Sequence, residues 1–154
     1  MGFDLYGMNP QTDKPEPPQP SMKTGKWTDE EVKQWETYEK WRADSGGYFR
    51  NNVWWWRPLW EFVCDQCDDI LTEKDMARGH SNDGHRISKK KAEVIAERLF
   101  SLLDNGQVDE FEKRYKEHIN SLNDKDWDKQ YPFHKDNVRE FANFCAKSGG
   151  FEIC

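Results

Sequence analysis

The chain has 154 residues, which is enough for one domain and too short for two ordinary ones. It carries 23 Lys and Arg against 29 Asp and Glu, and the net charge of −6 argues against binding of double-stranded nucleic acid, which needs a basic face. No run of eighteen apolar residues occurs, so we expect no membrane-spanning helix and no membrane partner.

Aromatic residues make up an unusual share of the apolar side chains. Leu, Ile, Val and Phe account for only 27 of the 154 residues, a proportion that on its own is typical of disordered chains. The 22 Trp, Tyr and Phe residues offset this shortage, because each buried ring removes roughly 150–250 Å² from water. We therefore expect residues 1–154 to form one compact domain with an aromatic core.

Four cysteines are too few for a secreted disulfide scaffold of this size. The first residues, from Met1 to Tyr6, lack the basic start and the apolar stretch of a signal peptide. We therefore expect a cytoplasmic protein with reduced cysteines.

The first third of the chain alternates between extended and helical patterns. Residues 2–7 alternate apolar and polar and end in glycine, which is typical of a short strand. Five of the seven prolines fall in residues 9–26 and predict an extended surface segment. Thr28 and Glu31 then form a capping box, and the helix that they begin is expected to run to about Ala43.

Three further helices are predicted from apolar periodicity. Pro58 fits the first turn of a helix of about fourteen residues, because the missing proline N–H has no helical partner there. Ser88 can cap the next helix, which has a clean apolar stripe. Residues 108–122 give a fourth helix with apolar residues at helical spacing.

The end of the chain suggests contact between the two termini. Residues 138–145 predict a fifth helix that ends at a glycine pair, and residues 151–153 could pair with residues 3–6. The sequence thus predicts a mainly α, single small domain of four to five helices, with one short two-stranded β pairing of the termini. The residues expected in its core are Trp60, Phe62, Val63, Ile95, Leu99, Leu102, Phe111, Tyr115, Phe141 and Phe144.

One spacing fits a zinc site. Cys64-x2-Cys67-x12-His80-x4-His85 matches the Cys2His2 pattern, and four such ligands could hold a tetrahedral ion. Both cysteines fall inside the helix predicted after Pro58, however, where packing in the core is the simpler interpretation. No cofactor is favoured, and zinc is the alternative.

A basic loop precedes the helix that Ser88 caps. It runs from Arg78 to Lys91 and ends in Lys89, Lys90 and Lys91, whose charge is unfavourable at a helix N-terminus. A bound phosphate or carboxylate would relieve this conflict. Alternatively, the lysines extend into water, where salt screens them.

Three consecutive tryptophans, Trp54–Trp56, cannot all face one core in a regular structure. At least one ring is therefore expected at the surface or in a cleft, where rings beside guanidinium and amide groups suit a flat polar ligand. The alternative is a tryptophan-rich core whose arginines cover the ring faces. The predicted ligand-binding residues are Arg50, Asn52, Trp56, Arg57, Asn82 and His85.

Catalytic patterns are scarce. The chain has no nucleophile elbow, phosphate-binding loop, His-Glu-x-x-His motif or dinucleotide fingerprint. An enzyme would most readily use His80 or His85 beside Asp83 as a general base. Cys145 and His134 are a conceivable nucleophile and base, but Cys145 falls on an apolar helix stripe and is better explained by core packing.

Five longer motifs stand out along the chain: GFDLYG at residues 2–7, YFRNNVWWWRPLW at 48–60, SNDGH at 81–85, NVREFA at 137–142 and SGGFEIC at 148–154. Together they resemble a family of small uncharacterised proteins found mainly in bacteriophage and environmental viral genomes. The resemblance implies no known activity, cofactor or catalytic residue.

By analogy with small phage proteins that lack catalytic motifs, we expect a non-catalytic binding protein. It would be a phage accessory protein of the host-takeover or anti-defence type, in the host cytoplasm, that engages a host protein or a small anionic, nucleotide-like ligand. The alternatives are a small zinc-stabilised structural module and a histidine-dependent enzyme of unknown class.

Overall fold

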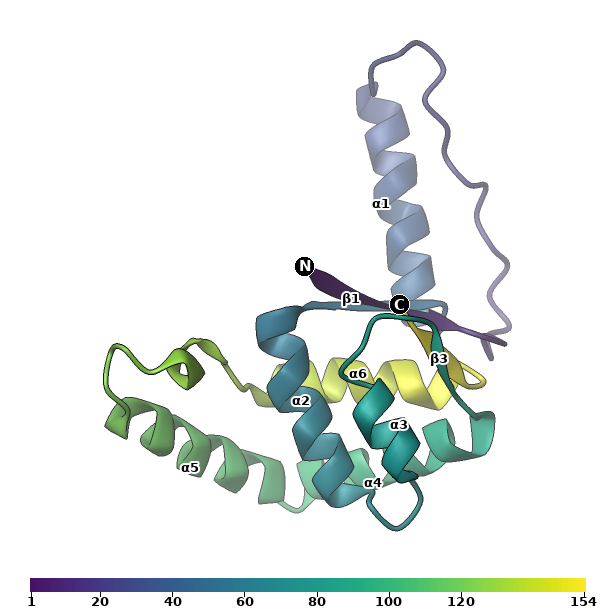
Figure 1. Ribbon diagram of the computed structural model, residues 1–154. Helices are drawn as coiled ribbons and strands as arrows, with labels where there is room; N and C mark the ends of the chain where they lie inside the picture. Colours follow the sequence, from purple (N-terminus) through teal and green to yellow (C-terminus); the bar gives the residue numbers. More distant parts are fainter.

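The computed structural model describes all residues, 1–154, and shows a mainly α fold with a small sheet (Figure 1). The mainly α class predicted from the sequence is confirmed, with six α-helices instead of four or five. In chain order the elements are β1 (Gly2–Gly7), α1 (Asp29–Asp44), β2 (Tyr48–Asn52), α2 (Val53–Gln66), α3 (Glu73–Arg78), β3 (His85–Ile87), α4 (Lys89–Asp104), α5 (Gln107–Ser121), the 3-10 helix η1 (Trp127–Gln130), α6 (Lys135–Lys147) and β4 (Phe151–Ile153).

The sheet has four antiparallel strands in the order β2-β1-β4-β3. The predicted pairing of the termini is present, with Leu5 of β1 opposite Ile153 of β4. Strands β2 and β3 extend the sheet on either side, so it is twice as wide as expected. Neither was predicted, because β3 has only three residues and β2 directly precedes the tryptophan run.

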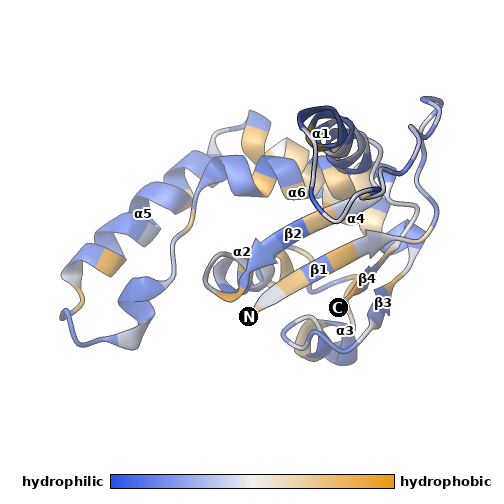
Figure 2. Cartoon of the chain, turned by 90° about the horizontal axis from the view of Figure 1, so that it is seen from above, coloured by the Kyte–Doolittle hydropathy of each residue, from blue (hydrophilic) through white to orange (hydrophobic).

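One face of the sheet is buried and the other is open. Phe3, Leu5, Phe49, Phe151 and Ile153 alternate with outward polar residues and face the core. Figure 1 shows α2, α3, α4 and α6 on this buried side, whereas α1 projects from the other side. Seen from above in Figure 2, the open face is in view and α5 extends away from the body.

The core is aromatic, as predicted. Eight of the ten residues expected there are buried, and the exceptions are Phe111 and Tyr115, which are half-buried. Both lie on α5, which extends from the body and therefore packs along only part of its length.

Helices α1 and α4 begin at the predicted capping residues, whereas α2 begins earlier than predicted. The capping box of Thr28 and Glu31 begins α1, and Ser88 caps α4. Helix α2, however, begins at Val53 and not at Pro58, because the Asn52 side chain caps it. Pro58 therefore lies inside the helix, where it is buried.

The remaining parts of the fold are helix α3 and the proline-rich segment. Helix α3 was not predicted, although Thr72 and Asp75 form a capping box at its start. The proline-rich segment 9–26 has neither helix nor strand anywhere along it, and it runs from the sheet to the far end of α1 (Figure 1). No helix has the length and apolar character needed to cross a membrane.

Candidate ligand site

Trp56, the ring expected to stack on a ligand, is fully buried. It stacks on Phe3 and on Trp60, with ring centroids 5.6 and 5.4 Å away. Its indole N–H donates a hydrogen bond to the carbonyl oxygen of Gly79 at 2.7 Å. The structure thus places Trp56 in the core, with no ring face open to a ligand.

The two asparagines of the predicted site hold the backbone in place. Asn52 Oδ1 accepts the backbone N–H of Trp55 at 3.1 Å and so caps α2. Asn82 Nδ2 donates to the carbonyl oxygen of Gly2 at 3.3 Å and fixes the loop before β3 against β1. Both amides thus have a structural explanation.

The remaining predicted residues do not meet in one hollow. Arg50 forms an ion pair with Asp4 at 3.6 Å and lines a hollow of about 530 Å³ between α1 and α6. His85 lines a different hollow of about 220 Å³, and the exposed Arg57 lines neither. The predicted combination of stacking and charge is therefore not assembled from these side chains.

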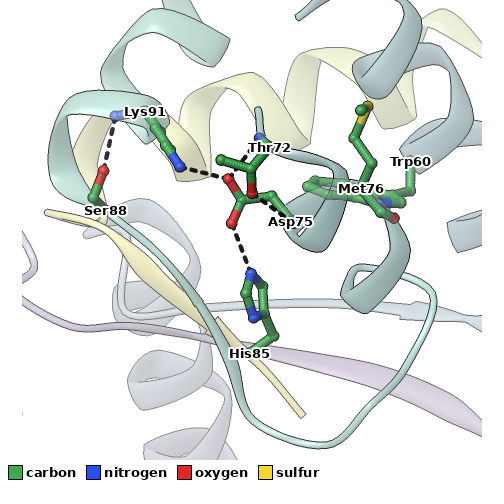
Figure 3. A network of polar contacts seen from close by, with 7 residues as sticks. All are labelled: Trp60, Thr72, Asp75, Met76, His85, Ser88 and Lys91. Carbon is green, nitrogen blue, oxygen red and sulfur yellow. Dashed lines mark hydrogen bonds and ion pairs between the residues drawn. The ribbon is translucent and has the colours of Figure 1, made fainter. Parts of the chain in front are cut away.

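His85 belongs to a buried polar network centred on Asp75, which joins α3, β3 and α4 (Figure 3). His85 Nε2 lies 2.8 Å from Asp75 Oδ1, the Lys91 ammonium donates to Oδ2, and the Thr72 N–H donates to Oδ2 at 3.0 Å. Burial opposes ionisation of the carboxyl group, but these donors outweigh it and lower the pKa of Asp75 to about 2.

The carboxylate of this network also compensates part of the unfavourable positive charge of the lysines at the start of α4. Lys91 turns towards Asp75, and Lys89 forms an ion pair with Glu93 at 2.6 Å. Two of the three lysines are therefore compensated within the chain, and the helix start needs no external anion.

The arrangement proposed for a histidine-dependent enzyme is not present. Asp83 forms an ion pair with Arg78, while His85 is paired with Asp75. His80 is partly buried, and this burial lowers its pKa. Neither histidine is thus oriented by Asp83, as the enzyme alternative required.

The zinc site is also not formed. Nowhere in the chain do three or more His, Cys, Asp or Glu side chains come close enough together to hold a metal ion. Cys67 is fully buried at the end of α2, and Cys64 packs against the core. His80 lies in the loop after α3 and His85 on β3, so helix α3 stands between the cysteines and the histidines along the chain.

A different surface combines aromatic rings with cationic groups: a groove of about 400 Å³ between the first turn of α2, helix α5 and the segment after η1. We call it the aromatic groove. Its rings are Trp55, Tyr115, Tyr131 and Phe133. The Tyr115 hydroxyl donates to the carbonyl oxygen of Tyr131 at 2.7 Å, which holds α5 and the 129–134 segment together. The other lining residues are Lys116, Ile119, Asn120, Lys129, Gln130, Pro132 and His134.

The floor of the aromatic groove is rigid because its rings continue into the core. Phe133 is buried and contacts Phe62, Phe111 and Tyr115, with ring centroids 4.8 to 5.6 Å away. Burial also raises the pKa of Tyr115 to about 12, so its hydroxyl stays neutral. The walls are therefore formed before any ligand arrives.

The side chains with a basic group at the aromatic groove are Lys116, Lys129 and His134, and no Asp or Glu lines it. Glu112, beside the groove, lies 3.4 Å from Lys116 Nζ and 3.5 Å from His134 Nε2 and orients both. Lys129 forms an ion pair with the exposed Asp124. The lining itself thus combines basic side chains with aromatic rings, and the carboxylates that pair with the lysines lie outside it.

Sequence reasoning found only part of this surface. It expected one ring of the Trp54–Trp56 run to reach the surface, and the half-buried Trp55 does so. It missed Tyr115, Phe133 and His134, because no local pattern signals that α5 and the 129–134 segment meet at Trp55.

No model of a known protein family, no curated protein and no solved structure matches this chain. The resemblance to a viral family therefore stays a prediction, and the function is argued from the site alone.

Proposed function

We propose that this is a non-catalytic binding protein whose aromatic groove holds a small, flat, anionic ligand of the nucleotide type. The observation that carries the proposal is the meeting of Trp55, Tyr115 and Phe133 with Lys129 and His134 in one groove. A volume of about 400 Å³ is in the range of small-molecule sites.

The rings favour a flat ligand. Trp55 is half-buried and lines the groove, and it makes no ring contact within the chain, so its indole is available to stack on a ligand. Stacking of a base on an aromatic side chain contributes roughly 1–3 kcal/mol. A planar heterocycle fits this surface better than a sugar or an aliphatic acid does.

The cations favour a negative group on the same ligand. The chain as a whole is acidic, with a net charge of −6, so attraction of anions must come from a local cluster. Lys116 and Lys129 bring positive charge to the groove, each paired with a carboxylate outside its lining, Glu112 and Asp124. A bound phosphate would compete with these carboxylates for the two ammonium groups, and the His134 ring adds a hydrogen-bonding group. A phosphate attached to the heterocycle would satisfy these groups.

The larger hollow beside Arg50 is a weaker candidate for such a ligand. Its lining includes the carboxylates of Glu39, Asp44 and Glu140, which repel anions. The phage accessory role in the host cytoplasm rests on the sequence resemblance and on the lack of a catalytic arrangement, and it belongs to the same proposal.

Thermal shift measurements with adenosine, ribose 5-phosphate and a panel of nucleoside monophosphates and triphosphates test this function. We expect saturable stabilisation by at least one nucleotide and a much smaller effect of each fragment, because only the nucleotide engages rings and cations together. Trp55→Ala and Lys129→Gln should reduce the response, whereas Trp35→Ala on the distant α1 should not. Equal responses of all three variants and the wild type would contradict the proposal.

A further inference from the structure

Helix α1 is a polar helix with one row of aromatic rings. Only Glu31 and Tyr38 of its residues are buried. Trp35, Tyr38 and Trp41 follow one another at helical spacing, and Trp27 continues the row before the helix. Neighbouring ring centroids are 6.0 to 6.2 Å apart, so the four rings form a continuous strip, which we call the α1 strip.

The inner half of the α1 strip already holds a proline-rich segment. The Trp41 indole N–H donates to the carbonyl oxygen of Lys14 at 3.3 Å. The Tyr38 hydroxyl donates to Glu16 at 3.2 Å, and Pro15 and Pro17 line one hollow with Trp41. Proline-rich backbones make no internal hydrogen bonds, so their carbonyls are free for a tryptophan N–H, and their rings pack on aromatic faces. Residues 14–17 thus show that the rings of the α1 strip can bind a proline-rich segment.

The same segment covers the outer half of the α1 strip less completely. Pro20 is buried and the Lys23 N–H reaches Glu31, but the outer rings stay open to solvent. Trp27 and Trp35 are 45% and 40% exposed, whereas Tyr38 on the covered half is 9% exposed. Val32, three residues before Trp35 on α1, is 41% exposed and adds to this apolar surface. Exposed tryptophans of this kind are typical of interaction sites.

The charge of α1 specifies the partner further. The helix carries six carboxylates and three cationic side chains, and its first turn holds Asp29, Glu30 and Glu31 beside the exposed rings. The backbone N–H of Lys23, from this chain's own segment, lies 3.4 Å from Glu31 Oε1. An acidic helix end next to exposed tryptophans suits a segment with Lys or Arg near its prolines.

We propose that the outer half of the α1 strip, Trp27 and Trp35 with the acidic first turn, docks a basic proline-rich segment of a partner protein. The segment would bind in an extended, polyproline-like form on the exposed part of these two rings, beside the chain's own residues 14–23. This surface is separate from the aromatic groove and does not depend on the function proposed for it.

Fluorescence anisotropy with a labelled ten-residue peptide that contains two Pro-x-x-Pro repeats and two arginines tests this inference. We expect saturable binding to the full chain, and no binding of a peptide in which alanines replace the prolines. Trp35→Ala should weaken binding at least tenfold, while Trp127→Ala, at a more exposed tryptophan outside α1, should leave it unchanged. Circular dichroism spectra that match the wild type would show that both variants are folded.

Three results would overturn the inference. The first is equal binding of the alanine peptide. The second is loss of binding in Trp41→Ala but not in Trp35→Ala, which would mean that the peptide displaces the chain's own segment instead. The third is self-association that Pro17→Ala abolishes, which would identify a second copy of this chain as the occupant.

Discussion

Trp56 donates its indole N–H to the carbonyl oxygen of Gly79, in the buried space between α2 and the end of α3. One turn further along α2, Trp60 donates to the carbonyl oxygen of Met76 at 3.0 Å. Two indoles of one helix therefore fix the backbone of the next helix, which carries Asp75. The tryptophan run contributes to the fold through these polar contacts as well as through buried ring area.

Gly79 is the position where this packing leaves no room for a side chain. A Cβ atom there would lie 2.0 Å from the indole of Trp60, which is fully buried and cannot move away. We expect Gly79→Ala to destabilise the protein by about 1–3 kcal/mol, the usual range for overpacking. Urea unfolding measures this change. Gly2→Ala, where the new atom meets only ordinary contacts of 3.4 Å or more, is the matched control and should change stability by less than about 0.5 kcal/mol.

The Asp75 network predicts a dependence of stability on pH. The carboxyl pKa is about 2 in the folded protein and 3.8 when unperturbed, so the ionised form stabilises the fold. This contribution is about 2 kcal/mol above the unfolded pKa and is lost as the pH falls through the folded pKa. The difference in unfolding free energy between the wild type and Asp75→Asn should shrink over that range. Asp68→Asn, at an exposed carboxylate, should show no such trend, and a constant difference for Asp75→Asn would contradict the account.

The helices could be predicted from the sequence because their signals are local. The capping box at Thr28 and the serine cap at Ser88 lie within four residues of the groups that they satisfy, and apolar stripes mark α4 and α6. Asn52 shows the limit of this reasoning. Its amide was assigned to a ligand, but the chain uses it to begin α2 one turn before Pro58.

The groove could not be predicted because its parts are distant in sequence. Trp55 and Phe133 are nearly eighty residues apart and meet only because α5 extends from the body and the 129–134 segment returns along it. Asp75 likewise lies on a different element from its partners His85 and Lys91, so no local pattern joins the three. The basic loop predicted a need for negative charge, but the sequence did not show that a buried carboxylate supplies it.

The cysteines are expected to behave as core residues. Burial raises the pKa of Cys64 to about 12 and that of Cys67 to about 11, so both thiols stay protonated near neutral pH. We expect iodoacetamide to modify Cys64 and Cys67 far more slowly in the folded protein than after unfolding in urea. The reaction rate of glutathione under each condition is the reference. Chelators should leave the melting temperature unchanged. One equivalent of zinc, lost with a fall in melting temperature, would restore the metal alternative.

His134 gives a further test of the aromatic groove. The ring lies 3.5 Å from Glu112 and lines the groove, where its N–H can donate to a bound phosphate. We expect His134→Gln to weaken nucleotide binding in calorimetric titration, because the glutamine amide does not reproduce the position of the imidazole N–H. His118→Gln, at an exposed histidine of α5 that does not line the groove, is the matched control. Equal nucleotide affinity of His134→Gln and the wild type would exclude this role for the ring.

Calorimetric titration with adenosine and guanosine monophosphates tests the central claim most directly, in the wild type, Trp55→Ala and Trp35→Ala. The account predicts saturable, single-site binding of at least one nucleotide to the wild type and to Trp35→Ala. It predicts at least tenfold weaker binding to Trp55→Ala, in line with roughly 1–3 kcal/mol for one stacked base. Binding that Trp55→Ala leaves intact, or no heat of binding to the wild type, would contradict it.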